Sequence, residues 1–366
     1  MKILHVTKKY PNALGGDAVV VKNLEKQQIA KGHKVAILTS NCPDIANEKH
    51  VYKAGLQDTA AALDSITPKR LLSLILLFFK AFYVIAKERP DVIHTHSVDM
   101  GFFVSFAARL FRKPLVHTFH IVTFNDPRHQ NLRGKIELWL LRGANPRQVT
   151  ILNPADKKGF VKAGFKNVHF VPNGVDRSFW KPGRPASNAI PTFIAVGRLE
   201  EQKGFTYLIE AAAKLHAKGV TFKLQIVGEG SLKGDLQSQI EVAGLQKMVV
   251  MMGAKTPAEL RTMYAKADAF VLSSLWEGMP LTLLEAWSMG LASVTTSVNA
   301  IPHIVKDNTL VVEPANVMQL AESMQQLAKS PALRTKLSTQ SLKLIESFEW
   351  AAVCDSMIKL YKKAAK

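Results

Sequence analysis

Short, almost wholly apolar runs alternate along this chain with longer segments in which apolar side chains recur every three to four residues. Runs of the first kind predict buried strands, and segments of the second kind predict helices. In the first half, the predicted strands are 2–7, 34–39, 91–94 and 115–118, and the predicted helices are 18–31 and 65–88. This alternation indicates a parallel sheet with helices on both faces.

The alternation stops once and then restarts. Between residues 171 and 192 the chain holds four prolines and two glycines, which is the composition of a linker. The later predicted strands are 193–196, 223–227, 249–252 and 269–272, with helices at 205–217, 235–243 and 257–266. We therefore predict an α/β fold of two doubly wound domains. Ligands of such sheets bind at the carboxyl ends of the strands, so we expect the site in a central cleft between the domains.

Composition narrows the class of protein. The 366 residues are 47% hydrophobic and 21% charged, which excludes a collagen, a coiled coil or a disordered chain. Cys42 and Cys354 are too few for a disulfide framework or a cysteine-based zinc site, and they suit a reducing compartment. The longest apolar stretch, 71–86, contains Lys80 and is too short to span a membrane, and the first apolar run is too short for a signal peptide.

The net charge of +19 is distributed unevenly. Residues 1–182 hold 28 Lys and Arg against 13 Asp and Glu, whereas residues 183–366 hold 20 against 16. Such asymmetry indicates an anionic partner, which can be nucleic acid, a membrane surface or an acidic polymer. The alternative is that the charge only aids solubility.

Two cations follow the first strand of the second domain. Arg198 comes directly after that strand, and Lys203 lies where the next helix begins. Two cations beside a helix N-terminus can bind a diphosphate. The alternative is that both are ordinary surface side chains.

Two glutamates eight residues apart form a second candidate group. Glu277 is expected in a loop, and Glu285 on the second turn of a helix for which Pro280 suits the first position. Gly278 permits close approach of the backbone to a ligand. Glu285 lies among apolar residues and needs a partner, either ligand hydroxyl groups or an internal Arg or Lys.

The first domain offers glycines and histidines. Gly15 and Gly16 lie in the first strand-to-helix loop, where backbone N–H groups can meet phosphates or sugars. His94 and His96 share a strand face, and His120 follows the next strand. Metal binding by these histidines is one interpretation, and we favour a polar, ligand-facing role for His120 instead. The sequence contains no P-loop and no Asp-x-Asp motif for a clamped divalent cation.

Taken in order, these motifs resemble the retaining glycosyltransferases of family 4, which have the GT-B fold of two Rossmann-like domains. The resemblance is nearly full length, and its most specific part is the pair of glutamates with the upstream Arg and Lys. It implies that the helix at about 347–366 returns to the first domain, 1–182, and that 183–346 binds the nucleotide-sugar. The matching segments are 15–16, 90–96, 116–120, 171–176, 196–199, 203–204, 226–230 and 277–285.

The resemblance also implies roles for individual residues. Arg198 and Lys203 would hold the diphosphate, Glu277 the sugar hydroxyls and Glu285 the ribose. His120 would lie beside the transferred sugar. Gly16 would contact the acceptor and the phosphates, and the base would pack near Met252 and Gly253. The backbone of four residues would bind sugar and phosphate oxygens; these are Gly278, Met279, Pro280 and Leu281.

The implied activity is retaining, metal-independent hexosyl transfer. The expected substrate is a UDP-sugar, or else a GDP-sugar, with no separate cofactor. We expect transfer of a hexose or N-acetylhexosamine to a glycan, lipid-linked or anionic polymer acceptor in cell-envelope or exopolysaccharide biosynthesis. The expected location is the cytoplasm, peripheral to the inner face of the plasma membrane. The alternatives are a GT-B sugar-nucleotide epimerase, which would need no acceptor, and a non-catalytic nucleic-acid binder, which the charge alone suggests.

Two features depart from the family pattern or leave alternatives open. The run 299–303 has His303 where the family usually has glutamate, and the glycine usual after residue 307 is absent. The helix 65–88 carries apolar side chains on nearly all sides. We expect a fully buried crossover helix there, and the alternative is a face that rests on a bilayer.

Overall fold

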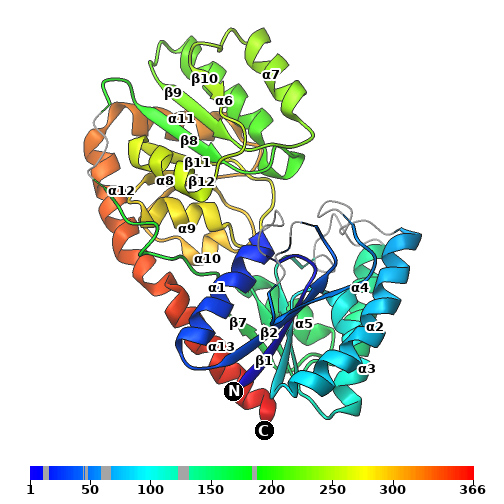
Figure 1. The fold of residues 1–366 in the computed structure, drawn as a ribbon. Coiled ribbons are helices and arrows are strands. Elements are labelled where there is room, and N and C mark those ends of the chain that lie inside the picture. Colours follow the sequence, from blue (N-terminus) through cyan, green and yellow to red (C-terminus); the bar gives the residue numbers. More distant parts are fainter. Residues whose placement is uncertain (11–15, 44, 46–47, 59–66, 123–131, 184–187) are drawn as a thin grey trace. The chain divides into compact units, whose positions relative to one another are not determined.

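The chain divides into two compact units in the computed structural model (Figure 1). The structure describes residues 1–10, 16–43, 45, 48–58, 67–122, 132–183 and 188–366. Unit 1 comprises Met1–Asn173 and Trp350–Lys366, and unit 2 comprises Gly174–Glu349.

Unit 1 is a parallel sheet covered by helices on both faces. Among its described residues, the seven strands in spatial order are β3 (Val51–Ala54), β2 (Lys34–Ser40), β1 (Lys2–Thr7), β4 (Val92–Thr95), β5 (Leu115–Phe119), β6 (Gln148–Ile151) and β7 (Val168–Phe170). Its helices are α1 (Gly16–Ala30), α2 (Pro68–Glu88), α3 (Val98–Leu110), α4 (Leu132–Ala144), α5 (Lys157–Lys162) and α13 (Trp350–Ala365).

Alternate residues of the central strands pack on opposite faces of this sheet. Leu4 and Leu38 join the apolar core under α2 and α3, whereas Ile37 packs beside Val21 of α1. Helix α13 lies against α1, on the same side as the side chain of His5, which bonds Gln28 of α1. The period of two along each strand therefore separates the face under α2 and α3, which is mostly apolar but carries Thr95 and His117, from the face of His5 and His94.

Unit 2 repeats the same design. Among its described residues, the six parallel strands in spatial order are β10 (Val249–Met251), β9 (Lys223–Val227), β8 (Thr192–Val196), β11 (Ala269–Leu272), β12 (Ala292–Thr296) and β13 (Leu310–Val312). Its helices are α6 (Phe205–Ala217), α7 (Lys233–Val242), α8 (Pro257–Lys266), α9 (Leu281–Ser288), α10 (Ile301–Ile304), α11 (Val317–Lys329) and α12 (Pro331–Leu344). The prediction of two doubly wound α/β domains is confirmed.

Residues 174–182, within the stretch of linker composition, belong to unit 2, whereas the sequence placed the boundary after residue 182. The N–H of Val175 donates to the carbonyl of Phe348 at 2.8 Å, and Arg177 pairs with Glu349 at 2.9 Å. The Ser288 hydroxyl donates to the carbonyl of Trp180 at 2.6 Å. These contacts anchor the segment although its composition is that of a linker.

This division sharpens the charge asymmetry. Unit 1 holds 30 Lys and Arg against 13 Asp and Glu, a net charge of +17. Unit 2 holds 18 against 16, a net charge of +2. The basic helix α13 adds to the charge of unit 1.

Helix α2 is buried on one face only, so the expectation of a fully buried crossover helix is wrong. Leu74, Leu77 and Val84 lie in the core of unit 1, whereas Leu71 and Phe79 are more than half exposed. The sheet supplies apolar surface to one side of the helix, and the opposite side keeps its leucines and aromatic rings in solvent. No helix in the described part of the chain is both long and apolar enough to cross a bilayer.

Candidate functional site

The carboxyl ends of three neighbouring strands of unit 2 are joined by backbone hydrogen bonds. The N–H of Gly197, just past β8, donates to Val227 at the end of β9 at 3.0 Å. The N–H of Gly228, just past β9, donates to Gly253, which lies after β10, at 3.0 Å. The loops that hold the candidate residues therefore start from one rigid edge.

Glycine is required at this edge because the backbones approach too closely for a side chain. A Cβ on Gly228, whose φ is +149°, would lie 1.9 Å from the carbonyl oxygen of Gly197. A Cβ on Gly204, whose φ is +59°, would lie 2.2 Å from the carbonyl oxygen of Ser273. The second contact holds the start of α6 against the loop after β11.

Lys203 and Glu277 form an ion pair at this edge. Lys203 Nζ lies 2.5 Å from Glu277 Oε1, and the two side chains are 14% and 7% exposed. The aliphatic stem of Lys203 passes beside Gly197, where a Cβ would lie only 3.0 Å from it. Ser274 Oγ donates to Glu277 Oε1 at 2.7 Å, and the Glu277 N–H donates to Asn299 Oδ1 at 3.0 Å. Both charged groups are thus held in place.

Arg198 lies next to this pair and is exposed. Its Nη2 donates to Gln202 Oε1 at 3.3 Å, and Gln202 Nε2 donates to the carbonyl of Trp276 at 3.0 Å. Gln202 therefore links Arg198 to the loop that carries Glu277. The structure pairs Lys203 with Glu277 and links Arg198 through Gln202 to the loop of Glu277. That these residues bind a diphosphate stays a prediction.

Glu285 is located on the second turn of α9, and its partner is a tyrosine. The Tyr264 hydroxyl lies beside its carboxylate, where the sequence left open an internal Arg or Lys, and it donates to the carbonyl of Thr282 at 3.4 Å. Burial raises the pKa of Glu285 to about 7, although the bond from Tyr264 opposes that shift. A carboxylate so poised gains from further donors, and ligand hydroxyl groups are of that kind.

The remaining candidates of unit 2 lie in the same loops. Gly278, Met279 and Pro280 connect β11 to α9, and Leu281 is the first helical residue. Pro280 is the N-cap of α9 and has extended backbone dihedrals, so the expectation that it occupies the first helical position is wrong by one residue. Met252 and Gly253 follow β10, and Gly253 has a φ of +66°.

In unit 1, a chain of hydrogen bonds runs through buried histidines to His120. His120 Nε2 lies 3.2 Å from His96 Nδ1, and His96 Nε2 lies 2.9 Å from His5 Nδ1. Gln28 of α1 continues the chain, because its Oε1 lies 2.9 Å from His5 Nε2. Its Nε2 donates to the hydroxyl of Tyr361 at 3.3 Å. The orientation of the His120 ring is thus coupled to residues on β1, β4, α1 and α13.

Burial keeps these rings neutral. It lowers the pKa of His5 to about 4 and that of His117 to about 3, and it holds the pKa of His94 well below the ordinary value. The pKa of His120 is also lowered by burial, although the Asp17 carboxylate opposes the shift. A neutral ring donates one hydrogen bond and accepts one, so the chain has a defined direction.

The start of α1 lies near His120. Gly16 is its first residue and is exposed, and the carboxylate of Asp17, in its first turn, raises the pKa of His120 against the effect of burial. Gly15, which the sequence also singled out, lies outside the described residues.

Among the residues that the structure describes, two groups of side chains have ligand atoms close enough together to hold a metal ion. They are His5 with His94 and His96, and Glu25 with Glu48 and His50. In the first group, each ring nitrogen already bonds a neighbouring side chain. In the second, Glu25 accepts from His50 at 2.6 Å and pairs with Lys22 at 3.1 Å. These contacts satisfy both groups as they stand.

Sequence reasoning missed the residues that hold the candidates in place. Gln202, Ser274 and Asn299 fix the loop of Glu277. Tyr264 lies beside Glu285, and the Tyr361 hydroxyl bonds His94 at 2.7 Å. Gln202 adjoins Lys203 and was within reach of a local argument. Ser274 lies three residues before Glu277 and was also within reach of such an argument. Asn299, Tyr264 and Tyr361 are at least 20 residues from their partners, so no short spacing indicates them.

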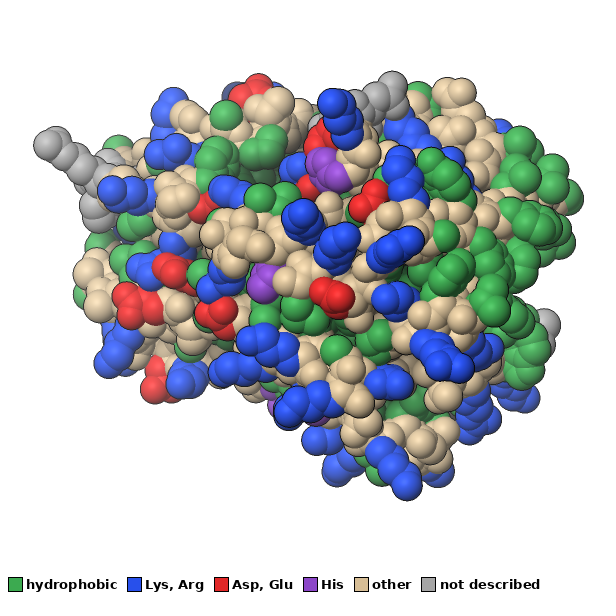
Figure 2. Space-filling view, turned by 60° about the horizontal axis from the view of Figure 1, so that its bottom comes forward, with side chains coloured by type: hydrophobic (Ala, Val, Ile, Leu, Met, Phe, Trp, Pro, Cys, Tyr) green, Lys and Arg blue, Asp and Glu red, His purple; other side chains and the backbone are tan. Residues whose placement is uncertain are grey.

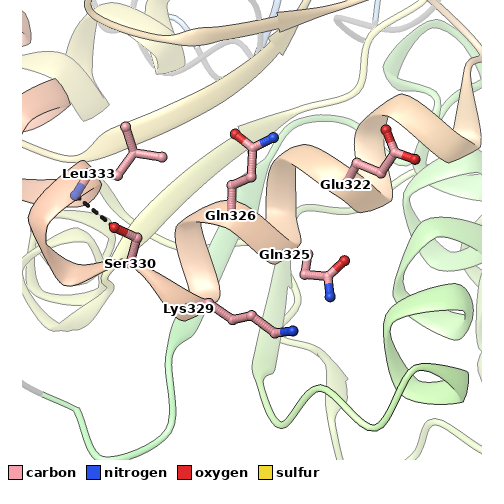
Figure 3. A pocket seen from close by; sticks show the side chains of 6 residues that line it. All are labelled: Glu322, Gln325, Gln326, Lys329, Ser330 and Leu333. Carbon is pink, nitrogen blue, oxygen red and sulfur yellow. Dashed lines mark hydrogen bonds between the residues drawn. The ribbon is translucent and has the colours of Figure 1, made fainter.

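A shallow hollow of about 480 Å³ lies elsewhere on unit 2. It is lined by Glu322, Gln325, Gln326, Lys329, Ser330 and Leu333, at the junction of α11 and α12 (Figure 3). None of the candidate residues lines it, and it holds no convergent set of charged groups. We therefore place the candidate site by its chemistry and not by this hollow.

Two family models match successive parts of the chain. The model described as "Glycosyltransferase Family 4" matches residues 14–179, and the one described as "Glycosyl transferases group 1" matches residues 176–343. The second match contains the whole candidate site of unit 2.

Individual proteins agree with these models. The chain is 27% identical over 316 residues to the UDP-Gal:alpha-D-GlcNAc-diphosphoundecaprenol alpha-1,3-galactosyltransferase of Escherichia coli, covering 80% of this chain and 79% of that protein. It is 22% identical to the GDP-mannose:cellobiosyl-diphosphopolyprenol alpha-mannosyltransferase of Komagataeibacter xylinus, covering 99% and 93%. The structure of sucrose-phosphate synthase from Thermosynechococcus elongatus superposes with a TM-score of 0.84 at 20% identity, covering 99% and 98%, and shows the same fold.

Proposed function

Because the chain belongs to glycosyltransferase family 4, whose members are retaining enzymes that take sugars from nucleotide-sugars, we propose a specific transfer reaction. The enzyme moves a hexose or N-acetylhexosamine from a UDP-sugar, or else a GDP-sugar, to a lipid-linked or glycan acceptor. The product enters cell-envelope or exopolysaccharide biosynthesis at the inner face of a membrane.

The ion pair of Lys203 and Glu277 beside Arg198 carries this proposal. The diphosphate of a nucleotide-sugar is bound by Arg198 and Lys203, and the sugar hydroxyls donate to Glu277. The N–H groups between Gly278 and Leu281 add donors for sugar and phosphate oxygens. Glu285 accepts from the ribose hydroxyls, and the base packs near Met252 and Gly253.

Charge stabilisation by these cations is the main contribution to catalysis. As the bond between the sugar and the diphosphate breaks, negative charge grows on the leaving group and positive charge on the sugar. Arg198 and Lys203 neutralise the leaving group without a bound divalent ion, and Glu277 stabilises the sugar. In unit 1, His120 contacts the transferred sugar and Gly16 the acceptor, which attacks the face that the diphosphate leaves.

Two observations favour a lipid-linked acceptor. Both relatives described above are named for acceptors attached to a polyprenol through a diphosphate. The net charge of +17 on unit 1 attracts such an acceptor and the anionic surface that holds it.

Transfer assays with paired substrates test the proposal. UDP- and GDP-sugars are each incubated with polyprenyl-diphosphate saccharides or with free oligosaccharides, and the anomeric configuration of the product is read by NMR. We expect transfer from one nucleotide class with retained configuration and no loss of rate in EDTA. An altered sugar-nucleotide formed without any acceptor would identify an epimerase and overturn the proposal.

Nucleotide binding should release protons near pH 7. The pKa of Glu285 is about 7 without ligand, and ribose hydroxyls that donate to its carboxylate lower that pKa. Since half of the carboxyls are protonated at pH 7, binding releases up to about half a proton per site. Calorimetric titrations in two buffers of different ionisation enthalpy measure this number.

Two variants control this measurement. Glu285→Gln should bind the nucleotide more weakly and release no proton. Glu241→Gln, which alters an exposed carboxylate on α7, should behave as the unmodified protein does. Equal proton release from Glu285→Gln and the unmodified protein would exclude Glu285 as the ribose ligand.

A further inference from the structure

We propose that the outer faces of α2, α3 and α4 form a docking surface for an anionic lipid bilayer. We call this surface the apolar face. The proposal rests on the proposed function in one respect only: a lipid-linked acceptor would be found at the bilayer to which the apolar face binds. Its members are Leu71, Leu72, Ile75, Leu76, Phe79 and Tyr83 of α2, Phe106 and Leu110 of α3, and Ile136 and Trp139 of α4.

Exposed apolar side chains are concentrated on these three helices. Ten of the 21 large hydrophobic side chains exposed in the described part of the chain lie there. Phe79 is 65% exposed, Leu110 is 68% exposed and Trp139 is 63% exposed. A concentration of this kind marks an interaction surface, whereas exposed apolar residues scattered singly do not.

The apolar face is continuous from one helix to the next. Helix α2 packs on α3, and α3 packs on α4. The ring of Phe78 lies 5.2 Å from that of Phe79 on α2 and 5.8 Å from that of Phe106 on α3. Phe102 then lies 5.3 Å from Phe106 and 5.4 Å from Trp139 on α4. The contacts between rings fix these side chains into one surface.

Cations lie among the rings of the apolar face. Lys80 Nζ is 5.1 Å from the centre of the Tyr83 ring, and Arg109 is 5.7 Å from that of Phe106. Together the three helices hold eight Lys and Arg against three Asp and Glu. Of the acids, Asp99 pairs with Arg70 at 2.9 Å, and Glu88 accepts from Tyr52. Aromatic rings mixed with cations suit the boundary between lipid headgroups and acyl chains.

The face of unit 1 that α2 covers shows this mixture directly. In Figure 2, hydrophobic side chains gather along the right-hand edge of the molecule, with Lys and Arg beside them. Helix α2 and its neighbours lie on the same side in Figure 1.

Charge favours a bilayer over a second copy of the chain. A symmetric dimer through the apolar face would bring together the same patch from both subunits, and so the cations of both. An anionic bilayer attracts the same cations, because its surface potential is negative. The proposed contact is made by the outer faces of three helices, none of which is long and apolar enough to span a membrane.

Vesicle flotation tests the docking surface. The protein is mixed with vesicles of phosphatidylcholine alone or with added phosphatidylglycerol, at low and at high salt. We expect binding only where phosphatidylglycerol is present, and weaker binding at high salt. The variant Leu71→Gln/Phe79→Gln/Leu110→Gln should lower the partition coefficient by more than about tenfold, since three side chains no longer enter the bilayer.

A matched variant separates this surface from apolar exposure in general. Val242→Gln/Val250→Gln/Met318→Gln changes three exposed apolar side chains of unit 2 and should leave vesicle binding unchanged. Thermal unfolding confirms that both triple variants fold. Both triple variants should bind the nucleotide, in the absence of vesicles, as the unmodified protein does. This measurement reports on the proposed transfer function, and vesicle flotation reports on docking, so the two can fail independently.

Three results would overturn the docking surface. They are no binding of the unmodified protein to phosphatidylglycerol vesicles, equal binding by the α2–α3 variant, and a dimer in solution that this variant dissociates. The last result would identify a second copy of the chain as the partner.

Discussion

Replacing Lys203 with alanine should lower kcat by about 10²–10³ while the protein stays folded. The loss is that expected when one preorganised charge is removed from a site that stabilises a leaving group. Two contacts hold Lys203 in place. Its Nζ pairs with Glu277 Oε1 at 2.5 Å, and its aliphatic stem packs beside Gly197. Initial rates at saturating nucleotide-sugar measure kcat, and thermal unfolding measures the fold.

Two further variants separate charge from packing. Lys203→Met keeps the aliphatic stem beside Gly197 and should lose about as much activity as Lys203→Ala. Lys233→Ala removes a cation of the same unit, from an exposed pair with Glu229 at 3.0 Å, and should leave kcat unchanged. Full turnover by Lys203→Ala would show that Lys203 does not stabilise the leaving diphosphate.

Replacing Gly228 with alanine should destabilise unit 2 by more than about 4 kcal/mol. The new Cβ would lie 1.9 Å from the carbonyl oxygen of Gly197, and its φ of +149° is one that an L side chain rarely adopts. Both atoms near the clash are backbone, so no rotamer change relieves it. The ends of β8 and β9 would have to separate, and Arg198 and Lys203 would move with them. Urea unfolding followed by tryptophan fluorescence measures the loss.

Gly244 provides the matched control. Its φ is +66°, but nothing lies within 4 Å of the position where a Cβ would stand. Gly244→Ala should therefore show the backbone strain alone, about 1–2 kcal/mol. If the two variants were equally stable, close approach of the backbones at Gly228 would not explain the glycine there.

The candidate site was partly accessible to sequence reasoning. Arg198 follows a predicted strand, and Glu277 follows another, so parallel topology alone brings them to one edge of a sheet. Their positions were predictable, but their contacts were not. That Lys203 pairs with Glu277, and that Asn299 holds the Glu277 backbone, depends on how loops 22 to 74 residues apart pack together.

Two expectations failed because tertiary packing overrides local pattern. Helix α2 is apolar on nearly all sides, which predicts burial, but the sheet covers one face of it and leaves Phe79 in solvent. The segment around Trp180 has the composition of a linker, but two contacts anchor it to unit 2. The Ser288 hydroxyl donates to the carbonyl of Trp180, and the Trp180 ring packs on Tyr264.

The alternation of strands and helices and the two doubly wound sheets followed from the sequence itself, because periodicity is a local property, although the strands β3, β6, β7, β12 and β13 were not predicted. That ligands bind at the carboxyl ends of the strands stays a prediction. The excess of positive charge on the first unit was also countable from the residues. Only the tertiary structure decided that Glu285 lies beside Tyr264, that Tyr361 joins the histidine chain of His120, and that α2 turns an apolar face outward. Each of these depends on surfaces that meet only after the chain has folded, and no spacing along the sequence encodes them.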